Sequence, residues 1–158
     1  MMTSIDYNVV FSRLFSRIQA YNFATMSKEQ LVDFLNEWLH SAASKPHVRR
    51  LFSSFSMDDE IKQLVYEMKY PLDEESDRDF VIEILSIGTA IQWLEPQIKS
   101  ITHISQLFAS KEEKFYSQSA HLSELRSLCT DFQTEQRRLI ADRSALLNVY
   151  IGDDNNEG

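Results

Sequence analysis

The sequence predicts a mainly α-helical protein: a bundle of about four to five helices, with one long C-terminal helix and an extended acidic tail. Apolar residues recur at spacings of three and four through most of the chain, which is the period of a helix with one buried face. Gly and Pro occur only three times each, too few for the turns of a sandwich or barrel. With 158 residues, 43% of them hydrophobic, we expect a single helical domain over 1–150 and a flexible acidic tail over 151–158.

The first third of the chain predicts two helices and a short third one. Apolar spacing favours a helix over roughly 6–22, with Asp6 as its cap. Residues 27–30 have the form of a capping box and begin a second helix. That helix must end before Pro46, because the residue ahead of a proline avoids helical angles, and Pro46 can itself open a short helix.

The segment 57–72 fits two different structures. A helix would place four apolar residues on one face: Ile61, Leu64, Val65 and Met68. A strand would place a different, alternating set on one side: Leu64, Tyr66, Met68 and Tyr70. Periodicity cannot decide between them in so short a run, so the segment is either a helix or a short strand.

A further helix begins near residue 73 with an acidic first turn. Asp73 or Ser76 is its expected cap, and the helix dipole favours the acidic residues there. Gly88 lies in its middle, where glycine costs ~1 kcal/mol relative to alanine. We therefore expect a neighbouring helix to approach closely at Gly88. Pro96 is expected to end or kink the helix, followed by a connection over 97–109.

The last predicted helix is the longest. Residues 110–113 form a second capping box, and the helical pattern continues to about residue 148. Some 32 helical residues would span ~48 Å. One seam repeats in steps of four and three: Gln118, Leu122, Leu125, Cys129, Phe132, Gln136, Leu139, Arg143, Leu146 and Tyr150. Because three of its positions are polar, two interpretations stay open: packing on the protein's own helices, or a contact with a partner.

Charge is distributed unevenly along the chain. The formal net charge is −8, which disfavours a nucleic-acid surface built from clustered Lys and Arg, so we expect no sequence-specific nucleic-acid partner. Residues 58–79 carry nine acidic and three basic side chains, whereas residues 1–57 carry four acidic and six basic ones. Such an acidic block is usually a solvated surface. Alternatively, a bipolar protein of this kind stacks head to tail or docks on a basic partner.

No pattern in the sequence indicates catalysis. The four histidines show no metal-binding spacing, and three glycines cannot build a phosphate-binding loop. We therefore expect no enzyme activity, no catalytic residue, no cofactor and no metal. A single cysteine indicates synthesis in a reducing compartment such as a cytoplasm. No run approaches 18 apolar residues, so we expect no membrane span.

Arginine pairs and one tryptophan are the candidate contacts with a partner. Arginine is enriched in interfaces, although pairs beside acidic residues are more often surface ion pairs. Trp93 lies off the apolar line of its helix, so it is expected at an interface, whereas Trp38 is expected in the core. The candidate interface residues of the folded domain are Arg49, Arg50, Trp93, Arg137, Arg138 and Arg143.

Three stretches resemble a family of small virion proteins of tailed bacteriophages, the head–tail connector (adaptor or neck) components. They are residues 84–97 (ILSIGTAIQWLEPQ), 110–125 (SKEEKFYSQSAHLSEL) and 45–52 (KPHVRRLF). The resemblance covers about residues 45–125. It implies a helical, structural subunit that forms a homo-oligomeric ring of about twelve copies between portal and tail. The implied partners are the portal protein and tail or neck proteins, and the implied location is the virion, assembled in a bacterial cytoplasm.

The same resemblance bears on the end of the chain. Adaptors of this kind commonly reach a neighbour with a C-terminal segment, which here would include Tyr150, Ile151, Asp153 and Asp154. The resemblance gives no residue a catalytic role. The alternative function is a non-virion interaction module, such as a tail-assembly chaperone or a host-directed regulator.

Overall fold

The computed structural model describes residues 2–18, 28–107 and 112–154, with side chains described for 2–18, 29–100 and 120–146. The described elements follow in the order β1 (Thr3–Asp6), α1 (Tyr7–Arg17), α2 (Lys28–Ser44), α3 (Pro46–Arg49), β2 (Phe52–Asp58), β3 (Gln63–Met68), α4 (Glu74–Leu107) and α5 (Glu112–Asp154). Helices dominate this part of the chain, so the predicted mainly α class is confirmed. A small sheet accompanies them.

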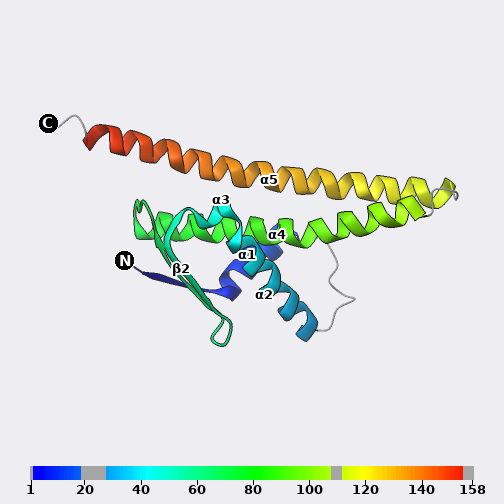
Figure 1. The fold of residues 1–158 in the computed structure, drawn as a ribbon, viewed down its shortest axis with the longest axis horizontal. Coiled ribbons are helices and arrows are strands. Elements are labelled where there is room, and N and C mark those ends of the chain that lie inside the picture. The colour runs from blue at the N-terminus through cyan, green and yellow to red at the C-terminus, as the bar shows by residue number, and fades with distance from the viewer. Residues whose placement is uncertain (1, 19–27, 108–111, 155–158) are drawn as a thin grey trace.

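Helix α4 is the central element of the fold. It runs antiparallel to α5, and α1, α2 and the sheet lie against its other side (Figure 1). Between Val81 and Leu94 almost every residue is buried, as expected for a helix covered on several faces. The two polar residues with hydroxyls in this stretch bond within the helix: Ser86 donates to the Glu83 carbonyl, and Thr89 donates to the Leu85 carbonyl.

The described strands form one antiparallel sheet in the order β1-β3-β2. Ile5 pairs with Leu64 across β1 and β3, and Phe55 pairs with Tyr66 across β2 and β3. In β3 the buried residues Leu64, Tyr66 and Met68 alternate with half-buried ones, which is the period of a strand. The strand interpretation of residues 57–72 is therefore confirmed, and the helical one is wrong.

The first helix starts where the sequence predicts but is shorter. Asp6 occupies the N-cap position of α1, which begins at Tyr7, so the predicted start is confirmed. The Asp6 side chain makes no cap bond; its Oδ1 accepts a hydrogen bond from Nε2 of Gln63 at 2.8 Å instead, because residues 3–6 form a strand paired with β3. Helix α1 ends at Arg17, with Ile18 at its C-cap, so the predicted end near residue 22 is wrong. The start of the capping box predicted at residue 27 lies outside the described residues.

The predictions around Pro46 and Asp73 are confirmed. Helix α2 ends at Ser44, and Pro46 occupies the first turn of α3. Asp73 caps α4, because its Oδ1 accepts a hydrogen bond from the Ser76 backbone N–H at 2.8 Å. That hydrogen bond lowers the pKa of the Asp73 carboxyl.

Gly88 lies where three helices meet, as predicted. A Cβ atom at this position would lie 3.0 Å from Cβ of Ala42 on α2 and 3.1 Å from Nε2 of Gln136 on α5. Real Cβ atoms rarely have such close neighbours, so the glycine permits the approach of both helices.

Pro96 does not end its helix, which corrects the expected connection over 97–109. Helix α4 continues through Pro96 to Leu107, and residues 108–109 lie outside the described residues. Pro96 itself is exposed, which leaves its ring in solvent. Nε2 of Gln97 donates to the Trp93 carbonyl at 3.1 Å, a side-chain bond within the helical turn that contains Pro96.

Helix α5 is longer than the sequence predicts. It extends to Asp154, so residues 151–154, which were predicted as tail, are helical; residues 155–158 lie outside the described part of the chain. Its 43 residues span about 64 Å. The apolar seam packs on the protein's own helices through Leu125, Cys129 and Phe132, which are all buried. For residues 125–143 the interpretation as an internal seam is therefore confirmed.

Candidate functional site

A groove of about 560 Å³ lies where the end of α2, α3, α4 and α5 come together. Small and apolar side chains line its floor, and Gly88 contributes no side chain at all: Ala42, Gly88, Ile91, Ile140 and Ala141. Polar side chains line the rest of it. The groove is thus an apolar trough with a polar rim, which is the composition of a binding site.

The rim of the groove is mainly basic. Lys45, His47, Arg50 and Arg137 line it, against the single carboxylate of Glu95. Arg50 and Arg137 are exposed, and within the described part of the chain neither guanidinium forms an ion pair. In a protein with a formal net charge of −8, this concentration of unpaired cations favours an acidic partner.

Gln136 fixes the inner wall of the groove. Its buried side chain donates from Nε2 to the Ile84 carbonyl of α4 at 2.9 Å. Its Oε1 lies 3.1 Å from Nε2 of His47 in α3. Because an amide oxygen only accepts, His47 Nε2 is the donor in this bond. Gln136, a polar residue in an otherwise apolar seam, therefore links α5 to both α4 and α3.

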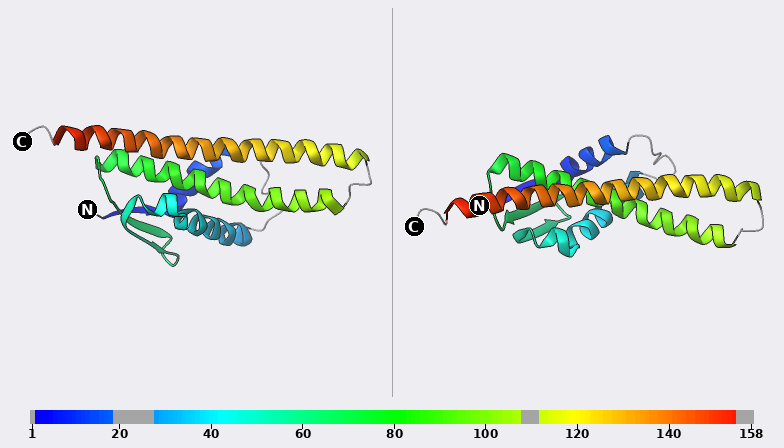
Figure 2. Two further views of the ribbon diagram at one scale, coloured as in Figure 1. Left: turned by 45° about the horizontal axis from the view of Figure 1, so that its top comes forward. Right: turned by 90° about the horizontal axis from the view of Figure 1, so that it is seen from above.

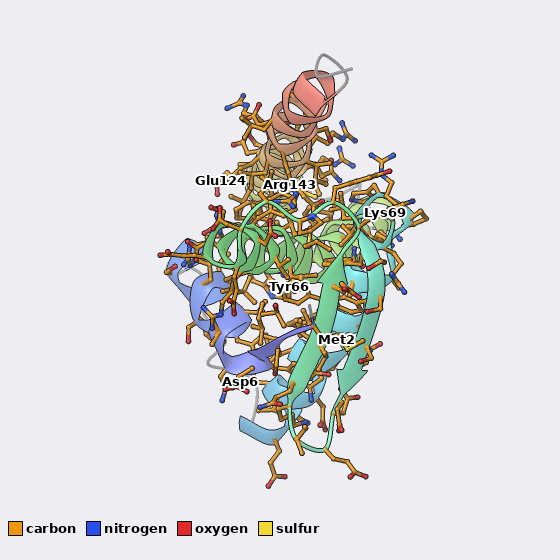
Figure 3. The ribbon with its side chains drawn as sticks, turned by 90° about the vertical axis from the view of Figure 1, so that its left-hand side faces the viewer. Met2, Asp6, Tyr66, Lys69, Glu124 and Arg143 are labelled. Atoms are coloured by element: carbon orange, nitrogen blue, oxygen red, sulfur yellow. The ribbon has the colours of Figure 1, made fainter. Side chains whose placement is uncertain are left out.

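Arg143 is an internal contact, which corrects its prediction as an interface residue. Its guanidinium forms an ion pair with Asp77 at 2.7 Å and donates to the Tyr70 carbonyl at 2.8 Å. It also lies over the ring of Phe80, 4.9 Å from the ring centroid. Figure 3 shows Arg143 between α5 and α4, at the end of the molecule where the sheet meets the long helices. The residue is only 6% exposed, so it stabilises the fold.

Trp93 is also buried, with 7% of its surface exposed, so its prediction as an exposed interface anchor is wrong. Trp38 is half-buried and stacks on Phe34, with 5.6 Å between ring centroids, and it packs against the core as predicted. The error arose because α4 is covered on several sides. A residue off its main apolar line is therefore still buried.

The remaining candidate contacts lie apart from one another. Arg49 is on the β2 side, where its guanidinium lies 5.9 Å from the ring centroid of Phe55. Arg138 is exposed on α5 and does not line the groove. Four others belong to the last turns of α5, and their side chains lie outside the described residues: Tyr150, Ile151, Asp153 and Asp154. Of the predicted set, the structure thus brings together Arg50 and Arg137.

Sequence reasoning missed the contributions of Lys45, His47 and Gln133 to the groove. Lys45 and His47 flank Pro46, and Gln133 lies more than 80 residues later. No periodic signal links the start of α3 to a position so far away on α5. A polar residue in an otherwise apolar seam, such as Gln136, was the one available sign of a special contact.

A second polar cluster joins the β2–β3 turn to the helices. Oδ1 of Asp59 accepts a hydrogen bond from the Tyr7 hydroxyl at 2.7 Å and lies 2.7 Å from Nε2 of His40. Burial raises the pKa of Tyr7, and the hydrogen bonds from Tyr7 and His40 lower the pKa of Asp59. The phenol thus stays protonated and the carboxylate ionised, which suits a structural clamp and not proton transfer.

The described part of the chain contains no group of three or more His, Cys, Asp or Glu side chains placed to hold a metal ion. Burial raises the pKa of the Cys129 thiol, which keeps it protonated. Across the same residues, no helix has the length and hydropathy to span a membrane. Comparison with known protein families, curated proteins and solved structures gave no match.

Proposed function

We propose that this chain is a structural protein of a tailed-phage virion: a head–tail connector subunit that forms a ring of about twelve copies between portal and tail. One observation carries the proposal. The antiparallel pair α4–α5 extends well past the compact part formed by α1, α2 and the sheet (Figure 2).

The lengths of the two helices support this interpretation. Helix α4 has 34 residues and α5 has 43, which correspond to about 51 and 64 Å. Among the described side chains, the buried ones of α4 lie between Asp77 and Leu94, and those of α5 between Leu125 and Arg143. A helix pair that extends beyond its own core offers a long surface to neighbouring chains, as subunits of an assembly do.

The resemblance to connector proteins adds the identity of the assembly. It includes the middle of α4, the first part of α5 and the segment around α3 that lines the groove. In the proposed ring, the portal protein lies on one side and tail or neck proteins lie on the other. Such a role needs rigid helices and complementary surfaces, and it needs no reacting group.

Purified particles of the phage that encodes the chain provide the test. We expect mass spectrometry to find the chain in them, at the copy number of the portal protein. A phage with the gene deleted should accumulate filled heads without tails, and a plasmid copy of the gene should restore tailed particles. If the chain is abundant in the lysate but absent from particles, the proposal is wrong and a chaperone or host-directed module takes its place.

A further inference from the structure

We propose that the basic groove receives the acidic start of α4 from a second copy of this chain, so that copies associate head to tail. The acidic turn is defined here as Asp73, Glu74, Glu75 and Asp79. This contact rests on the proposed ring, because it names the surfaces through which neighbouring subunits of that ring would meet.

The groove side of the contact consists of cations without internal partners. Arg50 lies at the end of α3, and Arg137 lies on α5. An adjoining hollow of about 360 Å³ shares Arg50 and adds Lys69, which is exposed. The two hollows share Arg50 and Ser144, and together their cations come from the end of α3, from α5 and from the residue after β3. The neutral side chains of Gln133 and Ser144 can bond the backbone or side chains of an inserted helix end.

The acidic turn offers the complementary charge. Glu74, Glu75 and Asp79 are exposed, and within the described residues their carboxylates form no ion pair. Two acidic residues at the β2–β3 turn, Asp58 and Asp59, are less available. Asp58 accepts hydrogen bonds from the backbone N–H groups of residues 60 and 61, and Asp59 is held by Tyr7 and His40.

In its own chain the acidic turn lies away from the floor of the groove. Asp79 and Gly88 belong to one continuous helix and are nine residues apart, which is about 14 Å along the axis. Glu74 and Glu75 lie farther still from the groove floor. In the proposed contact, a second molecule supplies these carboxylates to the groove.

The two surfaces are different parts of the molecule, so the contact is heterologous. Each copy that joins leaves one groove and one acidic turn open, and the contact repeats until the chain of subunits closes. A ring is the closed form of such an assembly. Because the contact is between exposed charges, salt should weaken it.

Charge reversal in the full-length chain tests the contact. The groove variant carries Arg50→Glu and Arg137→Glu, and the turn variant carries Glu74→Lys and Glu75→Lys. All four side chains are exposed, so both variants should fold, which circular dichroism and thermal unfolding check. We expect light scattering to find wild-type assemblies and two monomeric variants.

Mixing the two variants gives the decisive result. The reversed groove of one variant fits the reversed turn of the other, and the two unchanged surfaces also fit each other. An equimolar mixture should therefore assemble, although each component alone is monomeric. A mixture that stays monomeric overturns the contact, as does a wild-type chain that never associates.

Neighbouring residues on α5 supply a matched control. Arg137 lines the groove, whereas Arg138 is exposed outside it. We expect Arg137→Glu to weaken association by about tenfold and Arg138→Glu to change it by less than about twofold. Equal effects would overturn the contact in favour of general charge repulsion.

The outcomes separate this contact from the proposed function. Assemblies that survive both reversals overturn the contact and leave the connector role intact. Absence of the chain from virions overturns the connector role, whereas association in the mixture would still support the contact.

Discussion

Arg143 on α5 and Asp77 near the start of α4 form an ion pair 2.7 Å long, with each side chain only 7% exposed. The Asp77 carboxylate also accepts from the Leu72 backbone N–H at 3.1 Å, and Arg143 donates to the Tyr70 carbonyl. The pair therefore joins the long C-terminal helix to the loop that precedes α4. The ion pair lies beside the acidic turn and holds that turn in place against α5.

Removal of one partner of this pair should be costly. Asp77→Ala leaves the Arg143 guanidinium buried without its counter-charge, so we expect the free energy of unfolding to fall by about 3–5 kcal/mol. Urea denaturation measures this directly. The double variant Asp77→Leu with Arg143→Met should recover most of the loss, because neither charge remains. A loss below about 1 kcal/mol for Asp77→Ala would contradict a buried, interdependent pair.

Gly88→Ala should destabilise the protein although alanine is the better helix former. The added methyl would lie 3.0 Å from Cβ of Ala42, which cannot move without its backbone. Overpacking of about 1–3 kcal/mol should exceed the helical gain of about 1 kcal/mol. Ala42→Gly in the same chain should relieve part of the strain. A Gly88→Ala protein that is more stable than wild type in urea would show that the helices are farther apart.

The clamp at Asp59 predicts a dependence of stability on acid. Hydrogen bonds from Tyr7 and His40 lower the pKa of Asp59 below its ordinary value of 3.8 in the folded state. As the pH falls, Asp59 therefore binds a proton in the unfolded state before it does so in the folded state. The stabilisation by ionised Asp59 is complete above the ordinary pKa and is lost as the pH falls through the folded pKa. We expect Asp59→Asn to flatten the fall of unfolding temperature below about pH 4, measured by scanning calorimetry. An unchanged acid slope in the variant would exclude the clamp.

Tyr7 predicts a dependence of stability on alkaline pH. Burial, followed by the hydrogen bond to Asp59, raises the pKa of Tyr7 above its ordinary value of 10.0. The stabilisation by the protonated Tyr7 phenol is complete below the ordinary pKa. It is lost as the pH rises, because Tyr7 ionises first in the unfolded chain. Tyr7→Phe should therefore reduce the loss of stability above about pH 10. Scanning calorimetry of the wild type and the variant across the alkaline range measures this. If the unfolding temperatures of both proteins fall equally with pH, Tyr7 does not have this role.

Trp93 distinguishes a core residue from an interface residue. Because it is buried within the single chain, Trp93→Ala should lower the free energy of unfolding of the monomer by about 3–5 kcal/mol. Arg138→Ala, an exposed control on α5, should change it by less than about 0.5 kcal/mol. If the Trp93→Ala monomer keeps its stability and loses only its ability to associate, the interface interpretation of Trp93 is supported instead.

The helices could be predicted from the sequence because each depends on local spacing. The capping aspartate at residue 73, the proline that opens α3 and the glycine between three helices all follow from short-range chemistry. Strand β1 could not be found in this way. It has only four residues, and its Ile5 pairs with Leu64 of β3, which lies 59 positions later. Only this tertiary pairing makes the segment a strand.

The polar members of the seam illustrate the same limit. Gln136 and Arg143 made the seam too polar for a self-sufficient coiled coil, and Arg143 was predicted to contact a partner. Both side chains instead donate to carbonyls of the same chain, at Ile84 and Tyr70. Sequence spacing cannot reveal acceptors 52 and 73 residues away. The groove was hidden for the same reason. Arg50 and Arg137 were separately recognised as candidate contacts, but only the fold places them on one depression.

The connector role is tested most directly by native mass spectrometry of portal rings from the same phage, mixed with the purified chain. We expect a complex heavier than the portal ring by about twelve copies of 18.5 kDa, with few partly filled rings. A portal ring whose mass is unchanged by an excess of folded chain would contradict it.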